Sequence, residues 1–547
     1  MIRINRFLPW FYLLLTGVLS GISFMTEGST IAGFLSFIPA LFLADNFLKN
    51  LKNAVYWGIA LSISITVFTA SWLISTIAIY GHIPYPLAIV VFILFGTISS
   101  SRFILFFILV YLFKKADSLK PMQKYKINDT VAWLIFWGIS EYFSWQLFPV
   151  YGANFISQDL LLIQCADLVG VGGVSLLWFS ANLALYKLTL FFYQNKFKTS
   201  PHIFFSKNKG SLVTLSLILI AHIYGYYSLK YWSTPQNNTQ NKNVAVIQGN
   251  TPLAFENIRD IKSYIYSIAD GMKNQTLSLI EKSKILNEHI DLIVWPESAV
   301  PFLSYQDSEY YREIIQSIQR EYPVSMIFND IYYNNVNRNK YYNNMWMIDS
   351  NGIESHNYQK MLLLPFAEFI PLGNFFPVLY DLVPEISGFT PSKKRNLLAS
   401  GIGMILPSIC YELLPADFTL SFFQATGSKA QLIINITNDK WFGAGRENYQ
   451  HLEASKMRAI ELRLPVIRST NSGISAMILP SGVITGATES DKKESRIYSV
   501  PVPEKSVSFF SKTGYWPHKF IYISFLLVWI WTLYVNKIFP NYLLRKR

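Results

Sequence analysis

Long apolar runs dominate the sequence and leave few ways to fold it. Most of them reach the roughly 18–20 residues that a helix needs to cross a bilayer. They occupy residues 7–25, 31–47, 54–80, 86–113, 131–147, 168–192, 212–229 and 520–538. Charged residues make up only 15% of the chain, against about 25% in soluble proteins. We therefore predict a multi-pass membrane protein with about eight transmembrane helices, the first of them a helix and not a signal peptide because no small-residue cleavage site follows it.

Lysine and arginine residues alternate between the loops that join these runs. The loops at 26–30, 81–85 and 148–167 contain neither, whereas the intervening loops and both chain ends are basic. The basic positions are Arg3, Arg6, Lys49, Lys52, Lys114, Lys115, Lys120, Lys124, Lys126, Lys196, Lys198, Lys207, Lys209, Arg545, Lys546 and Arg547. Because such residues stay on the cytoplasmic side, both termini are predicted to be cytoplasmic and residues 231–518 to lie outside. The net charge of +13 then reflects topology and not nucleic-acid binding.

Two polar residues in the membrane part have competing interpretations. Glu141 lies within the fifth apolar run, where a carboxylate is costly. We expect it to be either a buried hydrogen-bonding anchor between helices or a functional group. Cys165, near a loop at the membrane edge, is expected to be structural. With only two cysteines in the chain, a disulfide framework is excluded.

A polar segment, residues 233–243, precedes a region in which short strand-like runs alternate with helical patterns. The predicted strands there are 244–248, 292–295, 324–328, 345–348, 404–409, 432–436, 466–469 and 475–479, and the predicted helices are 258–284, 308–321 and 450–464. Near-continuous apolar strands between helices predict an α/β layered sandwich. We therefore predict a seven-helix transmembrane bundle at 1–230, an outer α/β domain at 231–518, and a transmembrane helix with a basic cytoplasmic tail at 519–547.

Reactive side chains recur at or just after apolar runs of this domain. Glu297 follows the run DLIVWP, Lys360 and Glu368 lie in the stretch NYQKMLLLPFAEF, and Cys410 follows the run MILPSI. Each has an ordinary interpretation: a solvated loop glutamate, a lysine extended along apolar neighbours, or a small buried cysteine. Their coincidence favours one shared site.

These residue types suit acyl transfer through a cysteine. A thiol is mostly protonated at neutral pH and needs a base or a lowered pKa. Glu297 can take the thiol proton and return it if burial raises its pKa. The Lys360 ammonium and a backbone N–H after Cys410 are suited to bind the negative charge of a tetrahedral intermediate.

In the contexts WPES, YQK and CYE, Glu297, Lys360 and Cys410 resemble the Glu-Lys-Cys triad of the nitrilase superfamily. The segments VAVIQGN, NITNDKWFG and residues 450–482 are similar to others of that superfamily. A nitrilase-like domain between seven helices and one helix resembles the bacterial apolipoprotein N-acyltransferases. This resemblance implies an αββα sandwich, a multi-pass protein of the bacterial inner membrane, and a catalytic domain on the periplasmic side.

The resemblance also implies the reaction. A phospholipid donates an acyl chain to Cys410, and the α-amine of the N-terminal diacylglyceryl-cysteine of an apolipoprotein then takes it. Glu297 acts as base and acid, Lys360 stabilises the oxyanion, and no metal or cofactor is required. The resemblance also implies four supporting residues. Glu368 orients Lys360, and the Tyr411 N–H binds the oxyanion. Glu412 shapes the access of the amine, and Trp441 lines the pocket.

The sequence departs from this family at three places, one of which is the unusual segment ELLPADF after Cys410. The family often has Trp and Arg just after the intramembrane glutamate, whereas Tyr142 follows Glu141 here and no arginine lies nearby in the sequence. Lys440 replaces the small residue usual between Asp439 and Trp441.

Apolar segments flank the candidate residues at 299–303, 361–369 and 375–383. We expect them either to form lids that admit an acyl chain or to pack against the domain core. Two other functions remain open: a membrane-tethered amidase with water as acceptor, and a non-catalytic transport or binding protein. The latter would favour Gly/Pro-broken helices in matched halves, which the asymmetric seven-plus-one layout lacks.

Overall fold

The structure is a computed structural model of the whole chain. It describes residues 4–25, 28–118, 128–195, 200–234, 239–252, 260–333, 340–371, 373, 375–376, 378, 380, 388–443, 445–505 and 507–544. The chain forms two compact units. The helical unit comprises Met1–Ile77, Pro84–Tyr227 and Thr513–Arg547, and the sandwich unit comprises Ala78–Ile83 and Ser228–Lys512.

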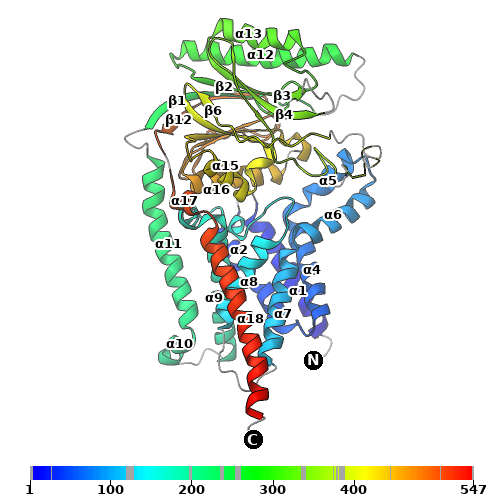
Figure 1. Cartoon of the computed structure of the whole chain (residues 1–547), viewed down its shortest axis with the longest axis vertical. Helices are drawn as coiled ribbons and strands as arrows, with labels where there is room; N and C mark the ends of the chain where they lie inside the picture. The colour runs from blue at the N-terminus through cyan, green and yellow to red at the C-terminus, as the bar shows by residue number, and fades with distance from the viewer. Residues whose placement is uncertain are drawn as a thin grey trace. The chain divides into compact units, whose positions relative to one another are not determined.

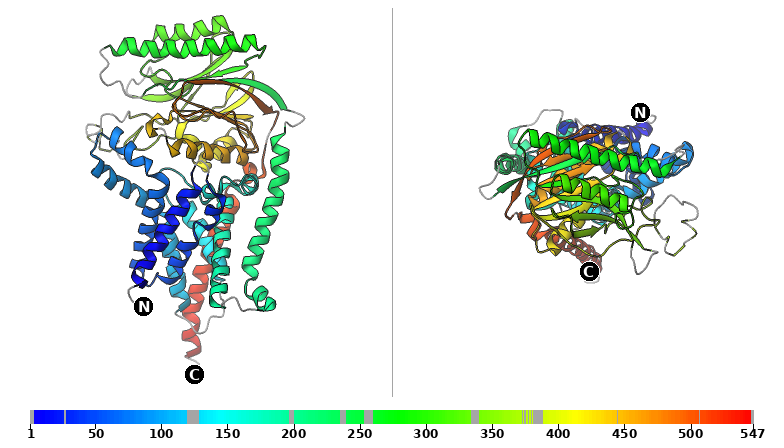
Figure 2. Two further views of the ribbon diagram at one scale, coloured as in Figure 1. Left: turned by 180° about the vertical axis from the view of Figure 1, so that it is seen from behind. Right: turned by 90° about the horizontal axis from the view of Figure 1, so that it is seen from above.

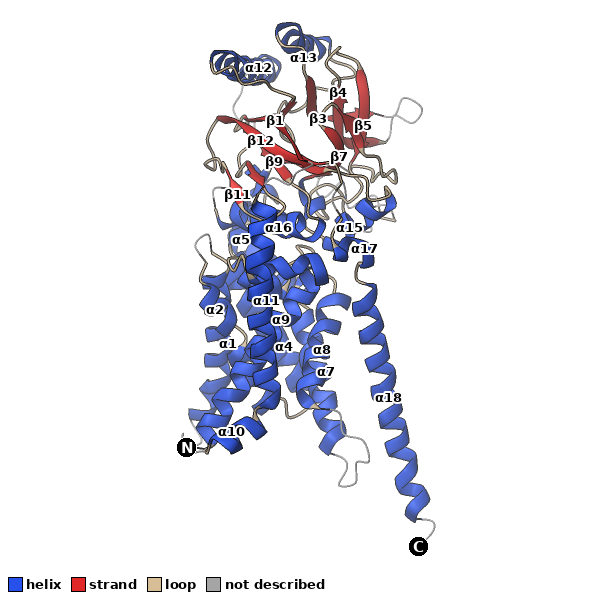
Figure 3. Ribbon diagram, turned by 90° about the vertical axis from the view of Figure 1, so that its left-hand side faces the viewer, coloured by secondary structure: helices blue, strands red, loops and turns tan. Residues whose placement is uncertain are grey.

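The predicted apolar runs fold as helices, and the described strands all lie outside the helical unit (Figure 3). The runs correspond to α1 (Ile4–Ser23), α2 (Thr30–Leu35) with α3 (Ile38–Asn46), α4 (Leu51–Ala70) with α5 (Trp72–Tyr80), α6 (Tyr85–Ser99) with α7 (Arg102–Ser118), α8 (Asp129–Phe143), α9 (Ala166–Gln194), α11 (Lys209–Ser233) and α18 (Trp516–Leu544). A short helix, α10 (Pro201–Lys207), precedes α11. Three of the runs are therefore divided, a feature that hydropathy alone does not reveal.

Within the described part of the chain, three helices are long and apolar enough to cross a membrane: Leu51–Ala70, Leu162–Gln194 and Lys209–Ser233. A fourth results if α6 and α7, bent by 48° at their junction, form one span. The count of eight spans and the orientation of the loops stay predictions. Of the basic positions, Arg3, Lys120, Lys124, Lys126, Lys196, Lys198, Arg545, Lys546 and Arg547 lie outside the described residues.

Glu141 has an arginine partner from a different helix. Arg102, the first residue of α7, lies 3.5 Å from the Glu141 carboxylate, and both side chains are buried. Arg102 also donates to the Val150 carbonyl, while the Gly152 N–H donates to Glu141 at 2.7 Å. The expectation of no nearby arginine therefore holds only along the sequence, because the break before α7 supplies one in space. These contacts support the interpretation of Glu141 as an anchor.

The sandwich unit contains two six-stranded sheets among its described residues, with strand orders β12-β1-β2-β3-β4-β5 and β11-β10-β9-β8-β7-β6. The first sheet comprises β1 (Thr239–Gln248), β2 (Leu292–Val294), β3 (Ser325–Tyr333), β4 (Tyr341–Ile348), β5 (Glu354–Gln359) and β12 (Glu494–Pro503). The second comprises β6 (Leu398–Ser400), β7 (Gly403–Ile409), β8 (Leu432–Thr437), β9 (Val466–Thr470), β10 (Ala476–Ile478) and β11 (Ile484–Thr485). In each, three central strands run parallel and their outer neighbours antiparallel.

Helices cover the outer face of each sheet. The pair α12 (Ile261–Ile285) and α13 (Glu309–Glu321) lies over the first sheet, and α15 (Ala416–Ala425) and α16 (Arg446–Leu462) lie over the second (Figures 1 and 2). A short helix, α17 (Phe509–Thr513), follows β12. Contacts between β1 and β9 join the sheets. The predicted αββα sandwich is therefore confirmed.

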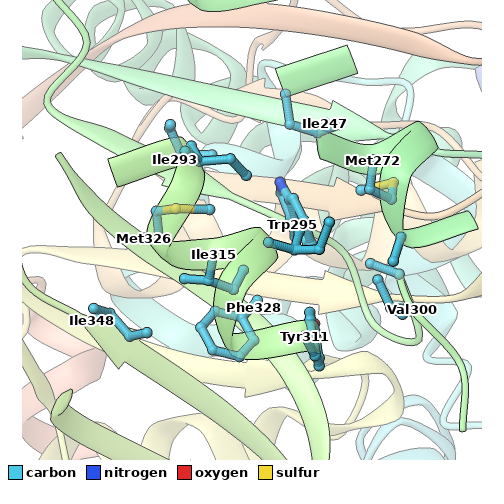
Figure 4. Close-up of a cluster of buried hydrophobic side chains, with 14 of the residues drawn as sticks. Ile247, Met272, Ile293, Trp295, Val300, Tyr311, Ile315, Met326, Phe328 and Ile348 are labelled. Carbon is cyan, nitrogen blue, oxygen red and sulfur yellow. The ribbon is translucent and has the colours of Figure 1, made fainter. Parts of the chain in front are cut away.

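The core beneath α12 and α13 fixes where the first candidate residue lies (Figure 4). Trp295 directly follows β2 and is fully buried in this core, where its Nε1 donates to Thr276 of α12 at 3.0 Å. Burial of such a side chain contributes roughly 1.5–3 kcal/mol. Pro296 then has no N–H to continue the sheet. The chain turns there, so Glu297 is held at the end of the strand.

Every predicted strand and helix of this domain has a counterpart in the structure. The sequence analysis missed β5, β6, β11, β12, α15 and the short α17. All four of these strands lie at sheet edges, and β5 and β12 have partly exposed faces and sequences, ESHNYQ and ESRIYSVPVP, that lack a continuous apolar run. Edge strands bury only part of their surface, so the apolar pattern that predicts a central strand is weak in them.

Candidate active site

The structure brings the three predicted reactive residues into one electrostatic cluster. Glu297 follows β2, Lys360 follows β5, and Cys410 follows β7. Lys360 Nζ lies 2.8 Å from Glu368 Oε2 and 3.7 Å from Glu297 Oε1. The charges of Glu297 and Lys360 both act on the Cys410 thiol. The site is thus assembled from strand ends that belong to both sheets.

Cys410 sits on a sharp backbone turn. Strand β7 ends at Ile409, and the 3₁₀-helix Cys410–Leu413 begins immediately. Cys410 itself has φ +52°, a left-handed conformation that residues with a Cβ rarely adopt. Such strain persists only where the surroundings enforce it, and it is concentrated at functional sites.

Glu412 ties this turn to the segment that carries Lys360. Its Oε2 accepts the Ile409 N–H at 2.9 Å, and its Oε1 accepts the N–H groups of Met361 at 2.7 Å and Leu362 at 3.0 Å. The Tyr358 hydroxyl donates to the same Oε1 at 2.8 Å. The Glu412 residue is fully buried. Its contacts are those of a clamp between two parts of the site, and its burial leaves it no surface toward an incoming amine.

Burial and the neighbouring charges together set the pKa values in this cluster. Burial raises the pKa of Glu297 above its ordinary value, although Lys360 acts against the shift and Glu368 adds to it. Burial alone would lower the pKa of Lys360, but the two carboxylates, Glu368 foremost, raise it well above its usual range. Burial also raises the pKa of the Cys410 thiol, so the thiol at rest is protonated and would need a base to act as a nucleophile. A buried carboxyl with a raised pKa and a permanently charged lysine lie beside it.

Asparagines that the sequence analysis missed hold the two carboxylates. Asn343 of β4 donates from Nδ2 to Glu297 Oε1 at 2.8 Å and to Glu368 Oε1 at 3.1 Å. The Asn438 N–H donates to Glu297 Oε2 at 3.0 Å. The one signal that pointed to Asn343 is its place beside a second asparagine in the otherwise apolar and aromatic strand YYNNMWMI.

Tyr411 and Trp441, the other predicted supporting residues, differ in exposure. Tyr411 is buried, which raises the pKa of its phenol to about 12. Trp441 is 44% exposed, and its ring meets Tyr80 edge-on with the centroids 4.9 Å apart. Lys440 turns to Asp491 at 2.7 Å and to the Asn250 side chain at 3.0 Å. The unusual lysine is therefore satisfied by an ion pair within the sandwich unit. Cys165, by contrast, is a buried residue of the helical unit.

The apolar segments near these residues contain both buried and exposed side chains. In the first, Ala299 and Val300 are buried in the core, whereas Phe302 is 68% exposed with φ +62°. Phe366, in the second, is 61% exposed with φ +64°. In the third, Phe375, Phe376 and Val378 are exposed, and most other residues of 375–383 lie outside the described ones. In the first two segments, exposed phenylalanines thus lie close to buried residues such as Val300 and Leu363.

One group of side chains has a spacing suited to a metal ion. Ligand atoms of Asp439, Glu447 and His451 lie within 4.8 Å of one another. Arg468 already donates to Asp439 Oδ2 at 2.6 Å, and His451 Nδ1 lies 3.1 Å from Asp439 Oδ1. Burial would raise the pKa of Asp439, but these two cations hold it well below its usual range. We interpret the group as a buried ion-pair network and not as a metal site.

Comparison with known proteins agrees with this geometry. Residues 243–505 match the carbon-nitrogen hydrolase family, so the sandwich unit has the fold of that class. Residues 16–184 match the apolipoprotein N-acyltransferase N-terminal domain. Among solved structures, an amidase from Nesterenkonia sp. aligns with a TM-score of 0.37 and 14% identity over 52% of this chain and 97% of that chain, a likeness that carries no functional weight.

Full-length relatives decide the family. Apolipoprotein N-acyltransferase 1 of Leptospira interrogans is 30% identical over 541 residues, which cover 86% of this chain and 89% of that protein. The apolipoprotein N-acyltransferase of Geobacter metallireducens is 28% identical over 484 residues, which cover 87% and 86% respectively. The chain belongs to the apolipoprotein N-acyltransferase family and is therefore an acyltransferase.

Proposed function

We propose that this protein moves an acyl chain from a phospholipid, through a thioester on Cys410, to the α-amine of the N-terminal diacylglyceryl-cysteine of apolipoproteins. The observation that carries the proposal is the buried ion-pair cluster of Lys360 with Glu297 and Glu368, whose charges act on the Cys410 thiol. Family membership provides the acyl-transfer chemistry, and this cluster provides the groups for it.

The first half-reaction transfers the acyl chain from the phospholipid to Cys410. Glu297 takes the proton of the Cys410 thiol, and the sulfur attacks the ester carbonyl of the phospholipid. The carbonyl oxygen gains negative charge, which Lys360 and the Tyr411 N–H stabilise. When the intermediate collapses, the C–O bond breaks, and Glu297 returns the proton to the lysophospholipid alkoxide. The acyl chain is then a thioester on Cys410.

In the second half-reaction, the amine is the attacking group and the Cys410 sulfur is the leaving group. The amine of the acceptor attacks the thioester carbonyl, and Glu297 takes one of its protons. Lys360 again stabilises the oxyanion, the C–S bond breaks, and Glu297 returns the proton to the Cys410 sulfur. Lys360 needs its charge in both steps, and its partnership with Glu368 keeps that charge in place.

The proposed setting is the bacterial inner membrane. Residues 1–230 and 519–547 span it, and residues 231–518 form the catalytic domain on the periplasmic side. The exposed Phe302, Phe366 and Trp441 are suited to contact lipid chains that enter the site. The alternation of basic and neutral loops supports this orientation.

Mass spectrometry tests the proposal directly. Detergent-purified protein is incubated with phospholipid and no acceptor, and its peptides are then analysed. We expect an acyl adduct on the Cys410 peptide that hydroxylamine removes and that disappears when a diacylglyceryl-cysteine peptide is added. Absence of the adduct in folded protein would contradict the proposal. Release of free fatty acid as the main product would instead indicate water as the acceptor.

Glu368→Gln is expected to lower activity about 10- to 100-fold while the protein stays folded. The substitution removes a charge-assisted hydrogen bond to Lys360, which is worth about 1.5–3 kcal/mol. Lys360 must then pair more closely with Glu297, and the loss of the Glu368 charge lowers the pKa of that base. Steady-state rates across pH measure the effect, with the exposed Glu354→Gln as control. An unchanged rate would show that Glu368 does not orient Lys360.

Glu412→Gln tests whether Glu412 positions the nucleophile. An amide cannot accept on both sides, so at least one buried N–H among Ile409, Met361 and Leu362 loses its partner, at a cost of about 1–3 kcal/mol. We expect a lower Tm and a lower rate of acyl loading. Tyr358→Phe, which removes only one donor, should have a smaller effect. Normal loading with a selective defect in transfer to the amine would contradict this role.

A further inference from the structure

Two buried asparagines on adjacent strands lie between the backbone after Glu297 and its carboxylate. Asn329 belongs to β3 and Asn343 to β4, and these strands are antiparallel neighbours. Asn329 pairs with Met345, so Asn343, two residues from Met345, is the diagonal neighbour of Asn329 on the same face of the sheet. Strand pairing therefore places the two side chains next to each other.

Backbone groups fix the orientation of the Asn329 amide. The Ser298 N–H donates to Asn329 Oδ1 at 2.9 Å, and Asn329 Nδ2 donates to the Asn344 carbonyl at 2.9 Å. A backbone N–H can only donate and a carbonyl can only accept. If the amide turned over, both hydrogen bonds would be lost. The amide of Asn329 therefore has a single favourable orientation.

Asn329 in turn fixes the orientation of the Asn343 amide. Asn329 Nδ2 also donates to Asn343 Oδ1 at 2.7 Å. Because this oxygen is engaged, the amide nitrogen of Asn343 faces the other way, and it donates to Glu297 Oε1 at 2.8 Å and to Glu368 Oε1 at 3.1 Å. A turned amide would place two nitrogens against each other and an oxygen against two carboxylates. Asn343 is therefore held as a donor toward both carboxylates.

This fixed polarity matters for a group that gains and loses a proton. A freely turning amide can donate to a carboxylate and accept from a carboxylic acid, whereas a fixed donor favours the carboxylate. The other oxygen of Glu297 also faces a fixed donor, the Asn438 N–H at 3.0 Å. Burial raises the pKa of Glu297, and the hydrogen bonds from Asn343 and Asn438 act against that shift.

We propose that Asn329 is a positioning residue for the general base: by holding Asn343 as a donor, it favours the ionised form of Glu297 and the return of the proton after each transfer. Asn329 acts through Asn343, whose carbonyl also accepts the Lys360 N–H at 2.8 Å. The inference rests on the proposed function, in which Glu297 is the base.

Other groups also face Glu297, and replacing Asn329 leaves them unchanged. They are Lys360 after β5, Glu368 in the segment that follows, Cys410 after β7 and the Asn438 N–H after β8. Asn329→Leu removes the amide that orients Asn343 at a similar side-chain size. Asn343→Leu removes the donor itself.

The experiment measures alkylation of Cys410 by iodoacetamide in the full-length, detergent-purified protein, with the Cys410 peptide followed by mass spectrometry across pH. The thiol loses its proton to Glu297 only when the carboxylate is ionised, so the rate falls as pH decreases through the pKa of Glu297. We expect Asn343→Leu to displace this fall by about one unit to higher pH, since a hydrogen bond to a charged group is lost. Asn329→Leu should displace it in the same direction by less.

Two further measurements separate positioning from damage to the fold. The double variant should match Asn343→Leu, because Asn329 acts through Asn343 and the two effects do not add. Raising the pH should restore the alkylation rate of each variant, which a damaged site would not allow. If Asn329→Leu does not fold, Asn329→Ala is measured against the same expectation.

Gln319→Leu is the matched control. Gln319 is a buried amide of α13 in the same unit, and its nitrogen donates to the carbonyls of Val324 and Asp349. We expect it to leave the pH profile unchanged. An unmoved profile for Asn329→Leu, an equal displacement for Gln319→Leu, or no fall that Glu297→Gln removes would overturn the inference. Alkylation needs neither phospholipid nor acceptor, so failure of the proposed function would be seen separately, in the adduct experiment.

Discussion

Cys410→Ala is expected to abolish acyl loading and acyl transfer, because no other described side chain of the cluster can form a thioester. The substitution removes one sulfur atom from a buried site and leaves the Lys360 ion pairs unchanged. The left-handed backbone at this position is as costly for alanine as for cysteine, so we expect at most a modest change in Tm. The measurement is the acyl adduct after incubation with phospholipid, followed by product formation with the acceptor peptide.

The second cysteine provides the matched control for this variant. Cys165 is equally a buried free cysteine, but it belongs to the helical unit. Cys165→Ala is expected to load and transfer at the normal rate. Full transfer by Cys410→Ala would refute the thioester mechanism, and an adduct that persists in that variant would show that another residue is the nucleophile.

Glu297→Gln is expected to slow both half-reactions by about 100- to 10,000-fold, the usual contribution of a positioned acid or base. Glutamine keeps the size of the side chain and one acceptor for Asn343, although its amide meets the Asn438 N–H unfavourably. Glu368 still pairs with Lys360. Single-turnover rates of acyl loading and of amine transfer, measured separately, give the two effects.

The pH profile distinguishes a lost base from a disturbed fold. Glu297 accepts a proton only when it is ionised, so the rate falls as pH decreases through its pKa. Burial raises that pKa, and the acid limb therefore lies above the range of an ordinary glutamate. Glu297→Gln should lose the acid limb of the pH profile. Glu321→Gln, which removes the charge of an exposed glutamate at the end of α13, should keep that limb. A slow variant with an unchanged acid limb would assign the base to another group.

The local sequence was sufficient to predict the apolar helices, the central strands of the sandwich and the residues with reactive side chains. Apolar runs predict helices because a bilayer-length helix must be apolar along its whole length. The central strands of the sandwich were predicted for a similar reason, since β2, β7 and β8 are buried on both faces. Glu297 and Cys410 were found because a reactive side chain just after such a strand interrupts the apolar pattern, whereas Lys360 was found because it lies in the apolar stretch NYQKMLLLPFAEF.

By itself, then, the sequence determined the two-part architecture, the sandwich fold and the three candidate residues of the cluster. Only the tertiary structure decided the contacts that hold the buried polar groups: Arg102 against Glu141, Asn343 between two carboxylates, and Glu412 as a clamp. Each of these contacts joins residues that are far apart in the chain. Strand register and helix breaks bring them together, and those depend on packing across the whole unit. A local pattern records which face of an element is buried, but not which polar group it will meet there.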